Sequence, residues 1–131
     1  MWNFNSDKPI YCQLIEQFRL KILSGEYPPG SKVASVRELA HEACVNPNTV
    51  QRAFSELERE GLVYTQRTSG RYITADQELI SRCRSRTAAG FVSDFLQSME
   101  RIGIPKEQLP DELKKICKGV KECQPFSNAK G

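Results

Sequence analysis

The sequence predicts an α+β fold that is mostly α, with an N-terminal winged helix-turn-helix followed by a short all-helical C-terminal region. Two observations support this prediction. Between residues 9 and 75, three segments with helical spacing of apolar residues precede two short strand-like segments joined by a glycine-containing turn. From about residue 76 onward the apolar spacing is helical only. A chain of 131 residues has room for one domain and an appendage.

The first predicted helix runs from Pro9 to Gly25, because proline favours a first helical turn and glycine a C-terminal stop. Residues 27–31 contain two adjacent prolines and a glycine, so they form a turn, and Lys32 and Val33 suit a short strand. The apolar residues that recur about every 3.6 positions in this helix are Ile10, Leu14, Ile15, Phe18, Ile22 and Leu23.

The second and third predicted helices are separated by a turn of about three residues, which is the helix-turn-helix pattern. Ser35 and Glu38 fit a capping box at the start of the second helix. Asn46 and Pro47 suit the cap and first position of the third helix, which Gly61 ends. The inward stripes are Val36, Leu39, Ala40 and Ala43 in the second helix and Val50, Ala53, Phe54 and Leu57 in the third. A β-hairpin then joins strands Leu62–Thr65 and Arg71–Thr74 through residues 66–70.

The C-terminal helices carry more apolar surface than two short helices bury by themselves. Self-association covers such a stripe, so we expect a homodimer; the alternative is that the stripe packs only on the first helix of its own chain. The expected division is a winged helix-turn-helix domain at residues 1–75, a two-helix dimerisation region at 76–120 and a flexible tail at 121–131. The residues expected at the dimer interface are Phe91, Val92, Phe95, Leu96, Met99, Leu113 and Ile116.

Composition excludes several classes of protein. With one histidine, His41, and five scattered cysteines without a C-x-x-C pair, we expect no metal site and reduced thiols, as in a cytoplasmic protein. A redox sensor at Cys83, which lies between two arginines, is an alternative. No apolar run reaches the roughly 20 residues of a membrane helix, and no signal peptide is expected. We expect no cofactor and no enzyme, because no nucleophile, base and orienting group occur together.

The start of the third helix combines capping with groups that read DNA bases. Asn46 is explained by capping, whereas the cap needs neither Asn48 nor Thr49. Asn and Gln can hydrogen-bond adenine, Arg can hydrogen-bond guanine, and a Thr methyl can contact a thymine methyl. Gln51 and Arg52 therefore complete a base-reading set. From this helix alone, a solvated polar face explains the same residues equally well.

Two further features favour double-stranded DNA as the partner. Arg37 lies in the first turn of the second helix, where free amides and the helix dipole attract a phosphate. The hairpin tip carries arginines and small residues suited to backbone or minor-groove contacts. The net charge of +3 adds little to this argument. The residues expected at DNA are Arg37, Asn46, Asn48, Thr49, Gln51, Arg52, Arg67, Ser69, Gly70 and Arg71.

Five motifs follow one another in residues 9 to about 75, namely P-x-Y, L-x-G-x-x-x-x-G, S-x-R-x-L-A, N-T-V-x-R-A and L-E-x-E-G-L. Together they resemble the DNA-binding domain of the GntR family of bacterial transcription regulators, and the short C-terminal part is similar to its YtrA-like subfamily. The sequence departs from the family pattern at Ala34, Gln51 and Thr68, where proline, arginine and glycine are common.

The resemblance implies a transcription regulator, of the repressor type, that binds an inverted-repeat operator as a homodimer and controls a transporter operon. Two-fold symmetry then implies half-sites about one helical turn apart, or a multiple of it. The alternative is a winged-helix protein-protein interaction module without sequence-specific DNA binding, whose third helix would carry apolar or aromatic anchors. The sequence identifies no small-molecule effector.

Overall fold

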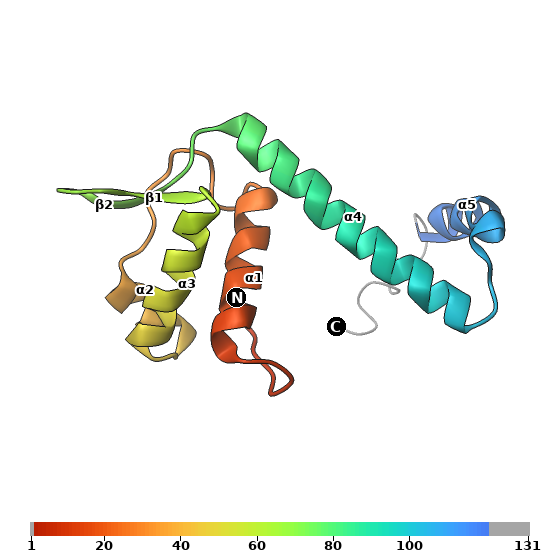
Figure 1. Cartoon of the computed structure of the whole chain (residues 1–131), viewed down its shortest axis with the longest axis horizontal. Helices are drawn as coiled ribbons and strands as arrows, with labels where there is room; N and C mark the ends of the chain where they lie inside the picture. Colours follow the sequence, from red (N-terminus) through yellow and green to blue (C-terminus); the bar gives the residue numbers. More distant parts are fainter. Residues whose placement is uncertain (1, 121–131) are drawn as a thin grey trace. The chain divides into compact units, whose positions relative to one another are not determined.

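The computed structural model describes residues 2–120, and the predicted flexible tail, residues 121–131, lies outside this range (Figure 1). The chain divides into two compact units, with the boundary between residues 86 and 87. The elements in chain order are α1 (Ile10–Leu23), α2 (Val36–Ala43), α3 (Pro47–Arg59), β1 (Val63–Gln66), β2 (Gly70–Ile73), α4 (Gln77–Arg101), the 3-10 helix η1 (Lys106–Gln108) and α5 (Leu109–Val120). The predicted α+β class, with a winged helix-turn-helix followed by helices, is confirmed.

Local capping fixes the helix-turn-helix. The Ser35 hydroxyl accepts from the Glu38 amide at 3.1 Å, and the Glu38 carboxylate accepts from the Ser35 amide at 3.0 Å, so the predicted capping box is confirmed. Cys44 ends α2 in the left-handed conformation, with φ of 57°. The Asn46 side chain then accepts from the Asn48 amide at 2.7 Å, and Pro47 occupies the first turn of α3.

The Ser35→Ala substitution is expected to lower the free energy of unfolding by about 1 kcal/mol, because the Glu38 amide loses its acceptor. Urea denaturation followed by circular dichroism measures the change. Ser81→Ala is the matched control, since Ser81 is exposed within α4 and alanine favours a helix interior. Equal losses in the two variants would contradict the capping role of Ser35.

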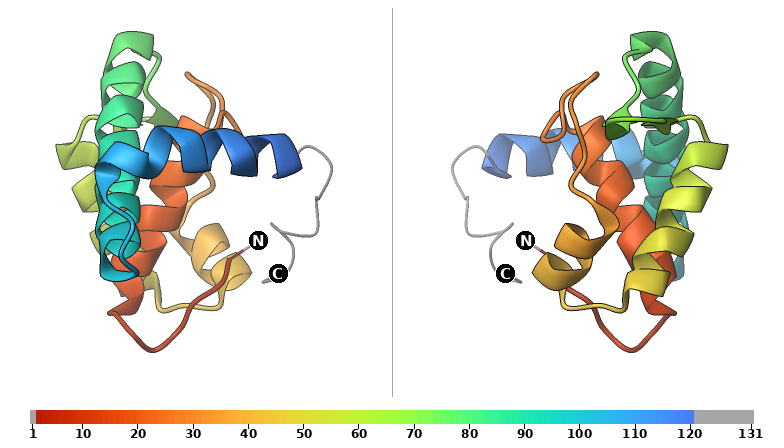
Figure 2. Two further views of the ribbon diagram at one scale, coloured as in Figure 1. Left: turned by 90° about the vertical axis from the view of Figure 1, so that its right-hand side faces the viewer. Right: turned by 90° about the vertical axis from the view of Figure 1, so that its left-hand side faces the viewer.

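The core of the first unit forms around α3, which packs against α1, α2 and β1 (Figure 1 and Figure 2). The predicted inward residues of α3 are at most 1 % exposed. The Phe54 ring meets Phe18 of α1 edge-to-face, with centroids 5.5 Å apart. The residues of this core with the largest fully buried side chains are Phe18, Phe54, Leu14, Ile22, Leu39, Leu57, Leu62, Ile73, Val50 and Val63.

The hairpin strands lie one residue closer to the turn than predicted. β1 and β2 pair antiparallel from Val63–Ile73 to Gln66–Gly70, which leaves residues 67–69 as the turn. The pairing extends this far because Gly70 adopts a φ of 112°, which lets the chain turn sharply. Lys32 forms a single bridge to Tyr72 rather than a full strand.

The first compact unit extends past residue 75, the boundary expected from the sequence. Ile80 and Cys83, in the first turns of α4, are buried in its core, and the Arg84 guanidinium donates to the Leu23 carbonyl at 2.8 Å. The expected boundary marks the change from hairpin to helix, whereas packing against the first unit continues for about two turns of α4. Cys83 is only 6 % exposed, so its thiol serves packing and the sensor alternative loses its support.

The residues before α1 form an extended segment that lies against it. The Gln13 side chain binds the backbone of Asn5 and Lys8, and the Gln17 side chain binds that of Asn3. The Trp2 ring stacks on Phe18, with centroids 6.3 Å apart. This segment has no signal in the sequence, because its hydrogen bonds depend on two glutamines whose spacing is that of an ordinary polar helix face.

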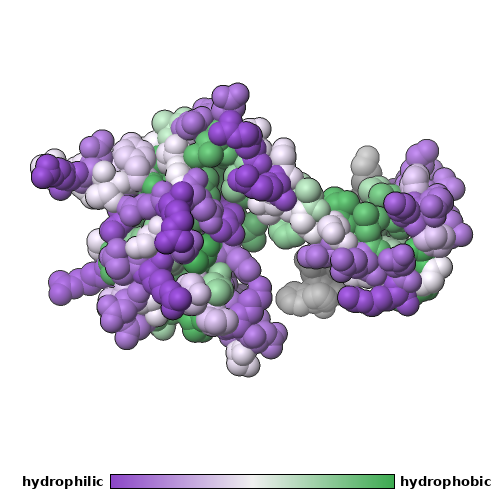
Figure 3. Space-filling model, viewed as in Figure 1, coloured by the Kyte–Doolittle hydropathy of each residue, from purple (hydrophilic) through white to green (hydrophobic). Residues whose placement is uncertain are grey.

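The second unit leaves much of its apolar surface exposed. In it, Leu109 is buried, while Leu96 and Met99 are half-buried. Figure 3 shows hydrophobic surface along this part of the chain. The exposed large apolar residues are Phe91 at 59 %, Val92 at 54 %, Phe95 at 37 %, Ile102 at 69 %, Leu113 at 43 % and Ile116 at 45 %. Within the described residues, these side chains are the exposed apolar surface of the second unit.

Candidate nucleic-acid interface

The first turns of α3 present the predicted base-reading residues to solvent. Asn48, Gln51 and Arg52 are exposed, and Thr49 is half-buried. Asn46 is also exposed, but its side-chain oxygen is used by the Asn48 amide, so its first role is to cap the helix. The cap holds the start of α3 in place. Within about two turns after it, α3 presents the hydrogen-bonding groups of Asn48, Gln51 and Arg52 and the methyl group of Thr49.

Arg52 is held against α1 by an aromatic ring. Its guanidinium carbon lies 3.6 Å from the centroid of Tyr11, a residue of the first turn of α1. This is the distance of direct stacking. In the sequence, Tyr11 stands out only as part of the P-x-Y motif, because a contact between α1 and α3 has no signal in residue spacing.

Arg37 lies at the start of α2 and is exposed. The capping box satisfies the amides of Ser35 and Glu38, and among residues 2–120 no acceptor engages the amides of Val36 and Arg37. These two amides and the Arg37 guanidinium are donors that can bind the oxygens of one phosphate group.

The wing is stiffened near its tip by aromatic side chains. The rings of Tyr64 and Tyr72 stack with centroids 5.8 Å apart, and the Tyr72 hydroxyl donates to the Ser69 hydroxyl oxygen at 3.1 Å. Arg67, Ser69 and Gly70 are exposed. A Cβ atom at Gly70 would lie 3.3 Å from the Lys32 side chain, which places a lysine beside the wing that sequence reasoning did not select.

Arg71 is placed differently from the other wing residues. Its guanidinium carbon lies 4.8 Å from the centroid of the Phe54 ring, and its Nε lies 3.5 Å from a Glu58 carboxylate oxygen. The Arg71 side chain is 21 % exposed. It therefore joins the hairpin to α3, and the contact of Arg71 with DNA stays a prediction.

Arg71→Ala is expected to lower the free energy of unfolding by about 1 to 2 kcal/mol, because a partly buried cation–π contact and an ion pair are lost together. Thermal unfolding measures the effect. Arg67→Ala is the control at the exposed tip of the same hairpin and should leave the melting temperature unchanged. A stable Arg71→Ala protein with weakened DNA binding would contradict the structural role.

Acidic residues at and just after the C-terminal end of α3 are paired, away from these groups. Arg59 binds Glu56 at 2.7 Å, and Arg19 of α1 binds Glu60. The hydrogen bond to Glu60 raises the pKa of Arg19 above its usual value. These pairs reduce the repulsion that free carboxylates would exert on a nearby phosphate backbone.

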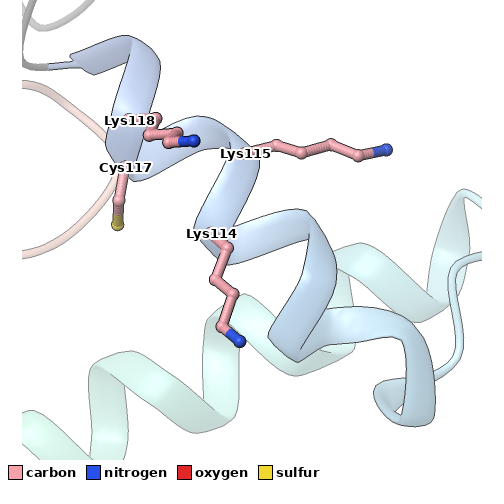
Figure 4. Close-up of a pocket in the computed structure, with 4 residues that line it drawn as sticks. All are labelled: Lys114, Lys115, Cys117 and Lys118. Atoms are coloured by element: carbon pink, nitrogen blue, oxygen red, sulfur yellow. The ribbon is translucent and has the colours of Figure 1, made fainter.

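Other kinds of site have little support in the part of the chain that the structure describes. Between residues 2 and 120, no three His, Cys, Asp or Glu side chains gather as metal ligands, and no helix is long and apolar enough to cross a membrane. His41 is exposed, as expected of a surface residue. A hollow of about 470 Å³ is lined by Lys114, Lys115, Cys117 and Lys118, all from α5, and Figure 4 shows that the lysines do not converge on one point.

The fold and the exposed polar groups define a class of protein. A winged-helix DNA-binding transcription regulator has this architecture. Its third helix is capped, an exposed arginine lies in the first turn of α2, and the wing is exposed. Residues 10–73 match the family model described as bacterial regulatory proteins, gntR family. The chain belongs to the GntR family of bacterial transcription regulators.

Full-length relatives agree with this assignment. The chain is 36 % identical to the uncharacterized HTH-type transcriptional regulator YhcF of Bacillus subtilis, covering 88 % of this chain and 96 % of that protein. It is also 36 % identical to the HTH-type transcriptional repressor YtrA of B. subtilis, over 89 % and 85 % of the two chains. These relatives are named as transcription regulators rather than enzymes, and the similarity to YtrA includes the C-terminal part, as the predicted YtrA-like subfamily requires.

A solved structure extends the similarity to three dimensions. A GntR family transcriptional regulator from Listeria monocytogenes superposes with a TM-score of 0.79 at 39 % identity, covering 86 % of this chain and 98 % of that chain. The similarity in fold therefore includes the helical C-terminal region as well as the winged helix-turn-helix.

Proposed function

We propose that the protein is a cytoplasmic homodimeric repressor that binds an inverted-repeat operator. The observation that supports this proposal best is the exposed polar set at the capped start of α3, in the same compact unit as an exposed wing tip. A docking helix would carry apolar anchors at these positions instead. The name of YtrA as a repressor supports the direction of regulation.

Each part of the first unit has a distinct task in the proposed complex. Asn48, Thr49, Gln51 and Arg52 enter the major groove and contact base edges. Arg37 and the wing residues Arg67, Ser69 and Gly70 contact the sugar-phosphate backbone or the minor groove. Phosphate contacts orient the domain, and base contacts select the sequence.

The second unit joins two such domains. Phe91, Val92 and Phe95 lie close together along α4 and expose apolar surface to water, and a second copy of the chain offers the same face. Burial of this face between two copies gives a two-fold symmetric molecule. Its operator then contains two half-sites in inverted orientation, about one helical turn apart or a multiple of it. Leu96, Met99, Leu113 and Ile116 complete the proposed interface.

The resemblance to the YtrA-like subfamily implies that the regulated genes form a transporter operon. Selection of binding sites from fragmented genomic DNA, followed by gel shifts at several salt concentrations, tests both the operator and its location. We expect a salt-sensitive, sequence-selective complex on an inverted repeat upstream of transporter genes. Binding that ignores sequence would contradict the operator, and a selective site elsewhere in the genome would contradict only the target.

A further inference from the structure

Arg52 differs from Arg19, Arg59 and Arg71 of the first unit in the groups that hold its guanidinium. Arg71 stacks on an aromatic ring and also lies 3.5 Å from a carboxylate. Arg59 and Arg19 are both paired with glutamates. Arg52 stacks on Tyr11, and within residues 2–120 no ion pair engages it. Its orientation is therefore set by a ring, and its hydrogen-bond donors are not taken up by an acid.

Stacking leaves the recognition edge of a guanidinium free. The five N–H donors of arginine lie in the plane of the group, whereas an aromatic ring contacts its flat face. A separation of 3.6 Å between the guanidinium carbon and the ring centroid is too short for an edge-on approach, in which the nitrogens would clash with the ring, so we infer that the flat face of the guanidinium lies on the ring. Arg52 can therefore keep its stack on Tyr11 while its edge donates two hydrogen bonds to the O6 and N7 atoms of a guanine.

Tyr11 is itself fixed by the fold. It lies in the first turn of α1, directly after Pro9 and Ile10, and is half-buried against the core of the first unit. The amides of Cys12 and Gln13, the two residues after Tyr11, both donate to the Pro9 carbonyl, at 3.1 and 3.3 Å. A long arginine side chain loses much rotational freedom when it binds, and a ring that restrains it beforehand reduces this loss.

We propose that Tyr11 is a positioning residue for base recognition, which holds the Arg52 guanidinium so that it reads one guanine in each half-site. The proposal rests on the proposed operator binding and adds the residue that sets its selectivity at one position. Tyr11 itself need not touch a base. Its effect is on selectivity: it increases the difference in affinity of the protein between the operator with the correct base pair and an operator in which that base pair is replaced.

The test uses the full-length protein and the operator obtained by site selection, together with a panel in which each base pair of one half-site is replaced in turn. We compare wild type, Tyr11→Leu, Tyr11→Phe and Arg52→Ala, and the double variant Tyr11→Leu/Arg52→Ala. One bidentate arginine contact gives a discrimination of roughly 5- to 150-fold at its guanine. Tyr11→Leu should reduce that discrimination by roughly 2- to 5-fold and leave the other positions unchanged.

The conservative and double variants separate positioning from packing. Tyr11→Phe keeps the ring and should retain the wild-type preference to within about 2-fold, since a phenyl face also stacks on a guanidinium. In the Arg52→Ala background, Tyr11→Leu should change the preference at the guanine position no further, because the group that it positions is gone. Thermal unfolding of every variant shows whether the domain remains folded at the temperature of the assay.

Three results would overturn the proposal. A uniform loss of affinity of Tyr11→Leu across the whole panel would assign Tyr11 to the phosphate backbone or to packing. A gain of affinity would mean that the stack holds Arg52 away from DNA. An unchanged panel would mean that the stack is irrelevant to recognition. A wild-type protein that shows no sequence preference contradicts the proposed operator binding itself, which distinguishes that failure from a failure of the positioning role.

Discussion

Phe95→Asp is expected to convert the dimer to a monomer and to lower operator affinity by roughly 100- to 10 000-fold, the range over which two linked binding modules exceed one. Phe95 is 37 % exposed in the apolar face of the second unit, together with Phe91 and Val92. A carboxylate placed in an interface made of two such faces loses its water without gaining a partner. Sedimentation velocity measures the first effect, and gel shifts on the selected operator measure the second.

The matched control is Gln97→Asp, which adds the same charge two residues further along α4. At 100° per residue, position 97 points to the opposite side of the helix from position 95, and Gln97 is already exposed. This variant should sediment and bind as the wild type does. A wild-type chain that sediments as a monomer would support the alternative that the stripe is covered within its own chain, and equal effects of both variants would contradict the assigned face.

Arg52→Ala is expected to weaken binding by about 1 to 3 kcal/mol at each half-site, and hence by about 2 to 6 kcal/mol on an operator with two half-sites. The loss should fall on one base-pair position, where the variant should tolerate all four bases. Binding measurements on the panel of substituted operators record both effects. Unlike Tyr11→Leu, this change removes the hydrogen-bond donors themselves.

Arg59→Ala provides the comparison on the same side of α3. Arg59 is two turns further toward the C-terminal end and is paired with Glu56 at 2.7 Å. Its removal should leave both affinity and base preference close to wild type. If Arg52→Ala weakened binding equally on every operator in the panel, Arg52 would be a phosphate contact and the base-reading role would be wrong.

The helix-turn-helix was predictable because its signals are local. Ser35 with Glu38, and Asn46 with Pro47, are pairs whose spacing alone determines a helix start. The inward stripe of α3 also follows from spacing, and its four residues are buried as expected. The exposed polar face of the same helix, which holds most of the candidate site, follows from the same periodicity.

The remaining features depend on contacts between elements far apart in the sequence. The burial of Arg71 against Phe54 requires the hairpin to fold back on α3, and the stack of Arg52 on Tyr11 requires α1 to lie beside α3. The extension of the first unit into α4 requires Ile80 to meet a core formed earlier in the chain. None of these contacts has a signature in residue spacing, so the sequence indicated neither the contact of Arg71 with α3 nor the contact of Tyr11 with Arg52.

Hydroxyl-radical footprinting of the full-length protein on its selected operator tests the central claim most directly. Two-fold symmetric, sequence-specific binding predicts two equivalent protected regions in inverted orientation, with centres about one helical turn apart or a multiple of it. Protection should disappear in Phe95→Asp at concentrations that saturate the wild type. A single protected region, or protection that moves freely along the fragment, would contradict a symmetric dimer that reads two half-sites.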